Sequence, residues 1–65
     1  MDKAKATEFL VQNRTRLGGE RLLNSPERWY FATENLPPEI GALVKPGHSG
    51  LILSENPDDT WNVRL

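Results

Sequence analysis

The chain has no cysteine, a single histidine and no long apolar run, and each absence narrows what it can be. Without cysteine there are no disulfides and no thiolate metal ligands, so 65 residues must be stabilised by packing or by association with another chain. A cysteine-free chain suits a reducing compartment, and no stretch resembles a signal peptide or a membrane span. We therefore expect one domain, residues 1–65, in the cytoplasm and with no membrane contact.

Neither sign of charge dominates the chain, whose formal net charge is −1. Basic side chains outnumber acidic ones in the first 28 residues, and acidic ones outnumber basic ones in the remainder. Proteins whose main task is to bind nucleic acid usually have a clear basic excess, so nucleic acid is the disfavoured partner.

The single histidine, His48, has no cysteine or second histidine with which to share a metal ion. A Ser-His-acid relay can be written with Ser49 or Ser54 and with Asp58 or Asp59, but no nucleophile-elbow motif accompanies it. We therefore expect no catalytic residue, no metal and no cofactor, which makes the chain a non-enzyme.

Residues 2–17 are typical of an amphipathic helix, because apolar side chains recur at spacings of three, four and seven among good helix formers. Asp2 is placed to cap the first turn, and Gly18-Gly19 is a typical helix stop. Residues 20–24 are too few to distinguish a helical turn from the start of a strand.

Four short extended segments follow the helix. Aromatic residues favour the first strand, although Ser25-Pro26-Glu27 resembles a helix start and leaves a short helix through 26–35 as the alternative. Asn56-Pro57-Asp58 favours a turn inside a C-terminal hairpin, with Trp61, Val63 and Leu65 on one face of its second strand. The predicted strands are 28–34, 40–45, 50–55 and 60–65.

Together these elements predict an α+β fold in which one helix covers a small antiparallel sheet of three to four strands. The run from Gly41 to Leu53, followed by Thr60-Trp61-Asn62-Val63-Arg64-Leu65, resembles the strand and turn pattern of SH3-like small barrels. That resemblance implies a sheet curled into a partly open barrel. The resemblance implies no particular function, because barrels of this kind have many different functions.

The aromatic segment is the best candidate for function. Alternation along a strand sends Trp29 and Phe31 to one face and Tyr30 to the other, so at least one aromatic ring is expected to be exposed. Tryptophan, tyrosine and arginine dominate protein-binding hot spots. We therefore expect a protein-interaction module, an inhibitor, adaptor or assembly factor of bacterial or phage type, which binds another protein or itself as a homodimer. The expected contact residues are Arg28, Trp29, Tyr30 and, at the edge strand, Leu65.

Two other functions remain open. In a nucleic-acid-binding regulator, the basic side chains of the N-terminal segment would meet phosphates; these are Lys3, Lys5, Arg14, Arg16 and Arg21. In an oligomeric enzyme, a site across a symmetry axis would contain several copies of His48.

Overall fold

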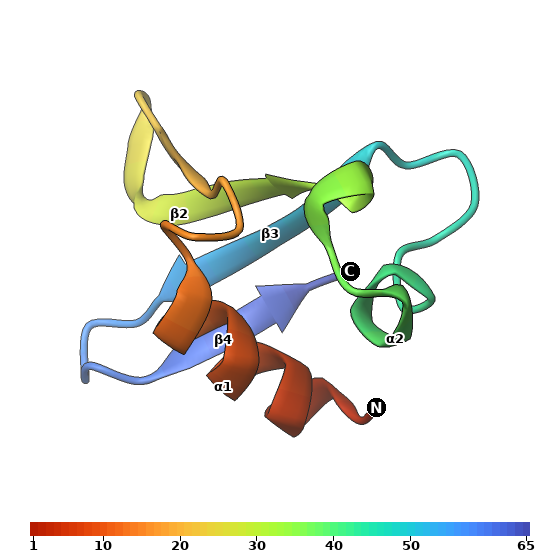
Figure 1. Cartoon of the computed structure of the whole chain (residues 1–65). Coiled ribbons are helices and arrows are strands. Elements are labelled where there is room, and N and C mark those ends of the chain that lie inside the picture. Colours follow the sequence, from red (N-terminus) through yellow and green to blue (C-terminus); the bar gives the residue numbers. More distant parts are fainter.

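Each strand of the sheet pairs with its neighbours in the sequence. In the computed structural model, which describes residues 1–65, the four strands form one antiparallel sheet in the order β1-β2-β3-β4. β1 and β4 are the two edges, so the sheet is open and does not close into a barrel. The elements are α1 (Lys3–Asn13), β1 (Glu20–Leu22), β2 (Ser25–Ala32), the 3-10 helix η1 (Thr33–Asn35), α2 (Pro38–Gly41), β3 (Gly50–Glu55) and β4 (Trp61–Arg64) (Figure 1).

Helix α1 begins at its predicted cap but ends before its predicted stop. The amide of Lys5 donates to Asp2 Oδ1 at 2.8 Å, so Asp2 is the N-cap. The helix ends at Asn13, four residues before the predicted end, and turns continue to Gly18, which has a φ of 73°. Only glycine enters this left-handed region without a Cβ penalty, which is why the chain reverses here.

Gly19 brings the chain close to the core. A Cβ at this position would lie 2.8 Å from the Arg14 carbonyl oxygen and 2.8 Å from ring atoms of Phe31. The Gly19 amide also donates to that carbonyl oxygen, at 2.8 Å. The missing side chain therefore lets the backbone after α1 lie directly on the Phe31 ring.

Residues 20–24, which the sequence left undecided, form β1 and the two-residue turn after it. The register of β1 and β2 shifts between Arg21 and Leu22, which marks a β-bulge or a similar irregularity. Ser25-Pro26-Glu27 belongs to strand β2 and does not start a helix. Because β3 pairs only with residues 28–32 of β2, the tip of this hairpin projects beyond the rest of the sheet (Figure 1).

The strand predicted at residues 40–45 is wrong, since these residues form the end of helix α2 and the turns after it. Pro38 occupies the first helical position, where its missing amide costs nothing, and the Gly41 amide donates to the Pro37 carbonyl at 2.8 Å. Ile40 is buried, and Leu43 and Val44 pack beside it against the core. Their spacing of three and four therefore reflects a helical turn. The strand predicted at 28–34 begins earlier, at Ser25, and ends at Ala32, because η1 starts at Thr33.

The C-terminal hairpin agrees with its prediction, except that β4 ends at Arg64 and leaves Leu65 outside the strand. The backbone amide of Asn56 donates to the Thr60 carbonyl at 2.7 Å and so closes the turn around Pro57. Val63 is fully buried and Trp61 packs against the core on the same face of β4, while Arg64 lies on the opposite face and is exposed.

The core lies on one face of the sheet, and α1 and α2 cover that face (Figure 1). Its eight buried residues are Ala6, Leu10, Phe31, Leu36, Ile40, Leu51, Leu53 and Val63. No helix covers the opposite face, which we call the uncovered face. The register assigns to it Glu20, Arg28, Tyr30, Ile52, Ser54, Asn62 and Arg64.

Candidate functional site

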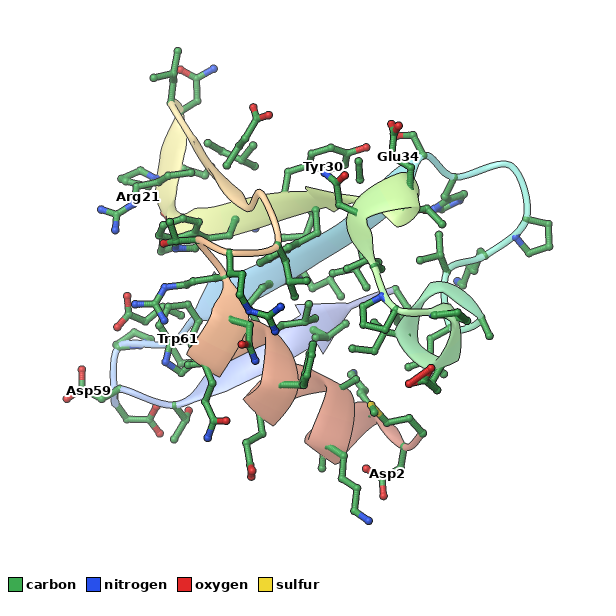
Figure 2. The ribbon with its side chains drawn as sticks, viewed as in Figure 1. Asp2, Arg21, Tyr30, Glu34, Asp59 and Trp61 are labelled. Atoms are coloured by element: carbon green, nitrogen blue, oxygen red, sulfur yellow. The ribbon has the colours of Figure 1, made fainter.

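Two arginines and two tryptophans alternate in a stack on the core side of the sheet. The Cζ atom of Arg14, just after α1, lies 5.4 Å from the centre of the Trp29 ring and 5.0 Å from that of Trp61. The Cζ atom of Arg21 lies 5.0 Å from the centre of the Trp29 ring. Arg21 and Trp61 lie at the same end of the molecule in Figure 2. We call these four residues the arginine–tryptophan stack.

The stack fastens the end of α1 to the sheet. A guanidinium within about 6 Å of a tryptophan ring contributes roughly 0.5–1 kcal/mol where it is exposed and more where it is desolvated. Arg14 is half-buried and also donates to the Val11 carbonyl oxygen. Both tryptophan rings are half-buried and already in contact with arginine side chains. Their main role in this arrangement is therefore structural.

The uncovered face has a mixed polar and apolar surface. One row across the four strands contains Glu20, Tyr30, Ile52 and Arg64, which are paired in register. Tyr30 is half-buried, and its hydroxyl donates to Ser49 Oγ at 2.8 Å. Ile52 does not belong to the core cluster. An apolar side chain and a tyrosine thus lie in the middle of a row with opposite charges at its ends.

The second row of this face contains buried polar atoms without partners. Arg28, Ser54 and Asn62 are paired in register. Ser54 is only 4% exposed, and neither its Oγ nor the Nε of Arg28 has a hydrogen-bond partner. A buried polar atom without a partner costs free energy, so such atoms in a native fold need an explanation.

The tip of the β1–β2 hairpin presents a leucine to solvent. Leu23 and Asn24 form the turn between the paired residues Leu22 and Ser25. The Leu23 side chain is 99% exposed, the highest exposure among the large apolar residues. It therefore contributes no packing to the fold, and a polar turn residue would serve the turn better.

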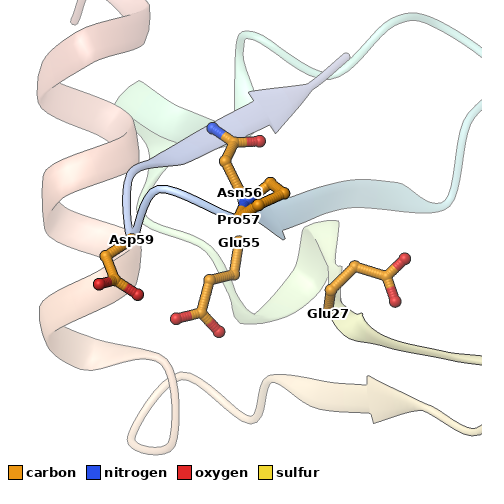
Figure 3. Close-up of a pocket in the computed structure, with 5 residues that line it drawn as sticks. All are labelled: Glu27, Glu55, Asn56, Pro57 and Asp59. Atoms are coloured by element: carbon orange, nitrogen blue, oxygen red, sulfur yellow. The ribbon is translucent and has the colours of Figure 1, made fainter.

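Acidic side chains surround a shallow hollow of about 520 Å³ beside the β3–β4 turn. Its lining is Glu27, Glu55, Asn56, Pro57 and Asp59 (Figure 3). No group of three or more acidic or histidine side chains in the structure is arranged to hold a metal ion. Next to the hollow, the Thr60 hydroxyl donates to Asp58 at 2.6 Å and the Thr60 amide at 3.1 Å, and these bonds lower the pKa of Asp58.

The structure separates the residues predicted to bind a protein partner. Arg28 and Tyr30 lie on the uncovered face, whereas Trp29 lies on the core side in the arginine–tryptophan stack. Leu65 follows β4 and is 40% exposed. The aromatic segment therefore does not form one contact surface, as alternation along the strand already indicated.

The basic residues of the nucleic-acid alternative do not form one patch either. Lys3 and Lys5 lie at the start of α1, and Arg14 and Arg16 follow its far end, about 16 Å along the helix axis. Arg14 and Arg21 are engaged with tryptophan rings, and Arg16 donates to Asn13 Oδ1 at 2.8 Å. His48 is exposed in the loop before β3, and the next residue, Ser49, accepts the hydrogen bond from the Tyr30 hydroxyl.

Comparison of the chain with known protein families, with curated proteins and with solved structures finds no match. None of the helices has the length and apolar character needed to cross a membrane. The fold and its surfaces define a small α+β domain with one covered and one uncovered sheet face and a projecting hairpin.

Two features of these surfaces escaped the sequence analysis. Leu23 is exposed because it lies in the β1–β2 turn, and no sequence pattern sets it apart from the other leucines. The row from Glu20 to Arg64 depends on the register of three strand pairs, and the sequence does not predict β1 as a strand. The segment Leu22-Leu23-Asn24-Ser25 carries the one usable signal, because two-residue turns often contain asparagine.

Proposed function

We propose that this protein is a non-enzymatic protein-interaction module of the cytoplasm, which acts as an inhibitor, adaptor or assembly factor of bacterial or phage type. Its contact with a partner polypeptide is the tip of the β1–β2 hairpin. One observation carries this function: Leu23 is 99% exposed on a hairpin that projects beyond β3. An apolar side chain presented in this way fits a pocket on another protein, where its burial favours binding.

The base of the hairpin is held in place. Arg21, two residues before Leu23, lies over the Trp29 ring, and Trp29 is paired with Leu53 in the buried part of the sheet. A contact residue on a supported hairpin loses less conformational freedom on binding than one on a mobile loop. The hairpin tip therefore combines an exposed apolar anchor with a fixed base.

Site-specific photo-crosslinking tests this function. A photoreactive amino acid is placed at position 23 and, in separate proteins, at the exposed positions 5 and 48. Expressed in the source cells, the position-23 protein is expected to form a covalent adduct of one defined mass. Excess parent protein should suppress that adduct, and excess Leu23→Ser should not.

Leu65→Ser is the matched competitor, because Leu65 is the other exposed leucine and follows β4, at the opposite edge of the sheet from β1. It should compete as well as the parent protein does. Adducts that form equally from positions 5 and 48, or competition by Leu23→Ser at parental strength, would exclude the hairpin tip as the contact.

A further inference from the structure

We infer that the uncovered face binds the uncovered face of a second copy, about a two-fold axis parallel to the strands and between β2 and β3. This interface is separate from the hairpin tip, so it goes beyond the function proposed above. It also differs from the pairing of β4 edges, the simplest homodimer that the sequence suggests. The order of charges across the sheet indicates that the partner bound to this face is a second copy of the chain.

The first row of the face is complementary to itself when reversed. Glu20 is exposed on edge strand β1 and Arg64 is exposed on edge strand β4, with Tyr30 and Ile52 between them. Three strand spacings, about 14 Å, separate the two charged residues within one chain. The two-fold rotation places Glu20 over Arg64 of the second copy, and Tyr30 over Ile52 of the second copy. The dimer therefore contains the Glu20–Arg64 contact twice and the Tyr30–Ile52 contact twice.

The second row supplies an independent observation. The same rotation places Arg28 on β2 over Ser54 on β3 of the second copy. Of the three buried side-chain atoms without a partner within one chain, two belong to this row: Arg28 Nε, a donor, and Ser54 Oγ, which can accept. Both atoms are buried within their own chain, so each copy provides the partner that the other copy lacks only after side chains at the contact rotate. Stacked sheets pack about 10 Å apart with nearly aligned strands, which is the separation that such side chains bridge.

The size of the face sets the expected strength. Four strands span only about 19 Å, so the buried area is smaller than the roughly 800 Å² per partner of a standard interface. The dimer is therefore expected to be weak, with a dissociation constant of about 0.1–1 mM. It should weaken further as salt screens the Glu20–Arg64 contacts.

Charge reversal with sedimentation velocity tests this interface, at protein concentrations from about 10 µM to 1 mM. The parent protein should dimerise in this range. Glu20→Arg and Arg64→Glu should each weaken dimerisation at least about tenfold, because each change places like charges together twice. An equimolar mixture of the two variants should dimerise as a heterodimer, since all four charges are then matched. Both residues are exposed, so the variants should fold, which circular dichroism checks.

Glu8→Arg and Lys5→Glu are the matched controls, because they make the same changes of charge at exposed positions on α1. They should dimerise as the parent does. A parent protein that stays monomeric to 1 mM, or a mixture of the two variants that does not recover dimerisation, would overturn the interface. So would unchanged dimerisation of the single variants, which would assign the contact to another surface such as the β4 edge.

Discussion

The guanidinium of Arg14 lies over the ring of Trp61, with 5.0 Å between the Arg14 Cζ atom and the ring centre. Arg14 follows helix α1 and Trp61 begins β4, so this contact joins the two ends of the fold. The neighbouring Trp29 ring, 5.4 Å from the same Cζ atom, extends the contact to β2. The arginine–tryptophan stack therefore connects elements that are far apart in the sequence.

Arg14→Ala is expected to lower the free energy of unfolding by about 1–2 kcal/mol, because it removes two cation–π contacts and the packing of a half-buried side chain. Urea denaturation followed by tryptophan fluorescence measures the change. Arg16→Ala is the control, since Arg16 is exposed and bonded only to Asn13, and it should cost less than about 0.5 kcal/mol. Equal effects of the two substitutions would contradict a stabilising role of the stack.

Trp61→Ala is expected to unfold the domain. Trp61 packs against the core cluster and contacts Arg14, and truncation of a large aromatic side chain in a core costs about 3–5 kcal/mol. That is comparable with the whole stability of a small domain. Near-UV circular dichroism should be lost at 25 °C. A cooperative melt close to that of the parent protein would show that Trp61 is peripheral.

Gly19→Ala should destabilise the fold by about 1–3 kcal/mol, because its Cβ would lie 2.8 Å from the Arg14 carbonyl oxygen and from the Phe31 ring. Gly41→Ala is the matched substitution, since a Cβ there meets nothing nearer than 3.7 Å, at Thr33. Gly41 ends a helix, so alanine should be neutral or slightly stabilising. Thermal melts of the two variants compare the positions directly, and similar melting temperatures would refute the close approach at Gly19.

Ser54→Ala should leave the monomer as stable as the parent protein or make it more stable by up to about 1 kcal/mol. The Ser54 hydroxyl is buried without a partner, and its removal ends a desolvation cost without breaking a bond. The same variant should weaken the proposed dimer, where that hydroxyl accepts from Arg28. Melts of the dilute monomer and sedimentation of the concentrated protein separate the two effects. A loss of monomer stability above about 1 kcal/mol would mean that the hydroxyl has a partner within the chain.

Thr60→Val should raise the pKa of Asp58 towards its ordinary value of 3.8, because it removes the hydrogen bond from the Thr60 hydroxyl, the main cause of the lowered pKa, and keeps the one from the amide. In the parent protein, the ionised Asp58 stabilises the turn above pH 3.8, and this contribution is lost as the pH falls through the lowered pKa. Carboxyl NMR titration measures the shift. Thr7→Val is the control, since the Thr7 hydroxyl donates to the Lys3 carbonyl on α1. An unchanged Asp58 pKa in Thr60→Val would contradict the assignment.

The sequence predicted the elements whose signals are local. Asp2 caps α1, Gly18 closes the turns that follow the helix, and the turn around Pro57 fixes the C-terminal hairpin, all through short-range contacts. β1 has only three residues and is stabilised by its pairing with β2, so no local sequence pattern predicts it. At residues 40–45, one run of apolar side chains suited a strand or a helical turn, and the turn that begins at Pro38 decided between them.

The candidate surfaces were predictable only in part, for the same reason. Alternation along β2 correctly separated Tyr30 from Trp29 and Phe31. The alternation could not show that arginine side chains lie over Trp29, because Arg14 follows helix α1 and does not belong to β2. Nor could it align Glu20 with Arg64, since that relationship passes through three strand pairs.

Helix α1 lies chiefly against β4, so the first element of the described chain is covered by the last. Ala6 and Leu10 of the helix are fully buried in the same core cluster as Val63 of β4, so the two elements bury apolar side chains against one core. A chain shortened by one hairpin strand therefore does not retain a smaller stable core. The domain is expected to fold in one cooperative step, with no stable N-terminal intermediate. Neither α1 nor β4 can bury its apolar side chains until the two elements pack against each other.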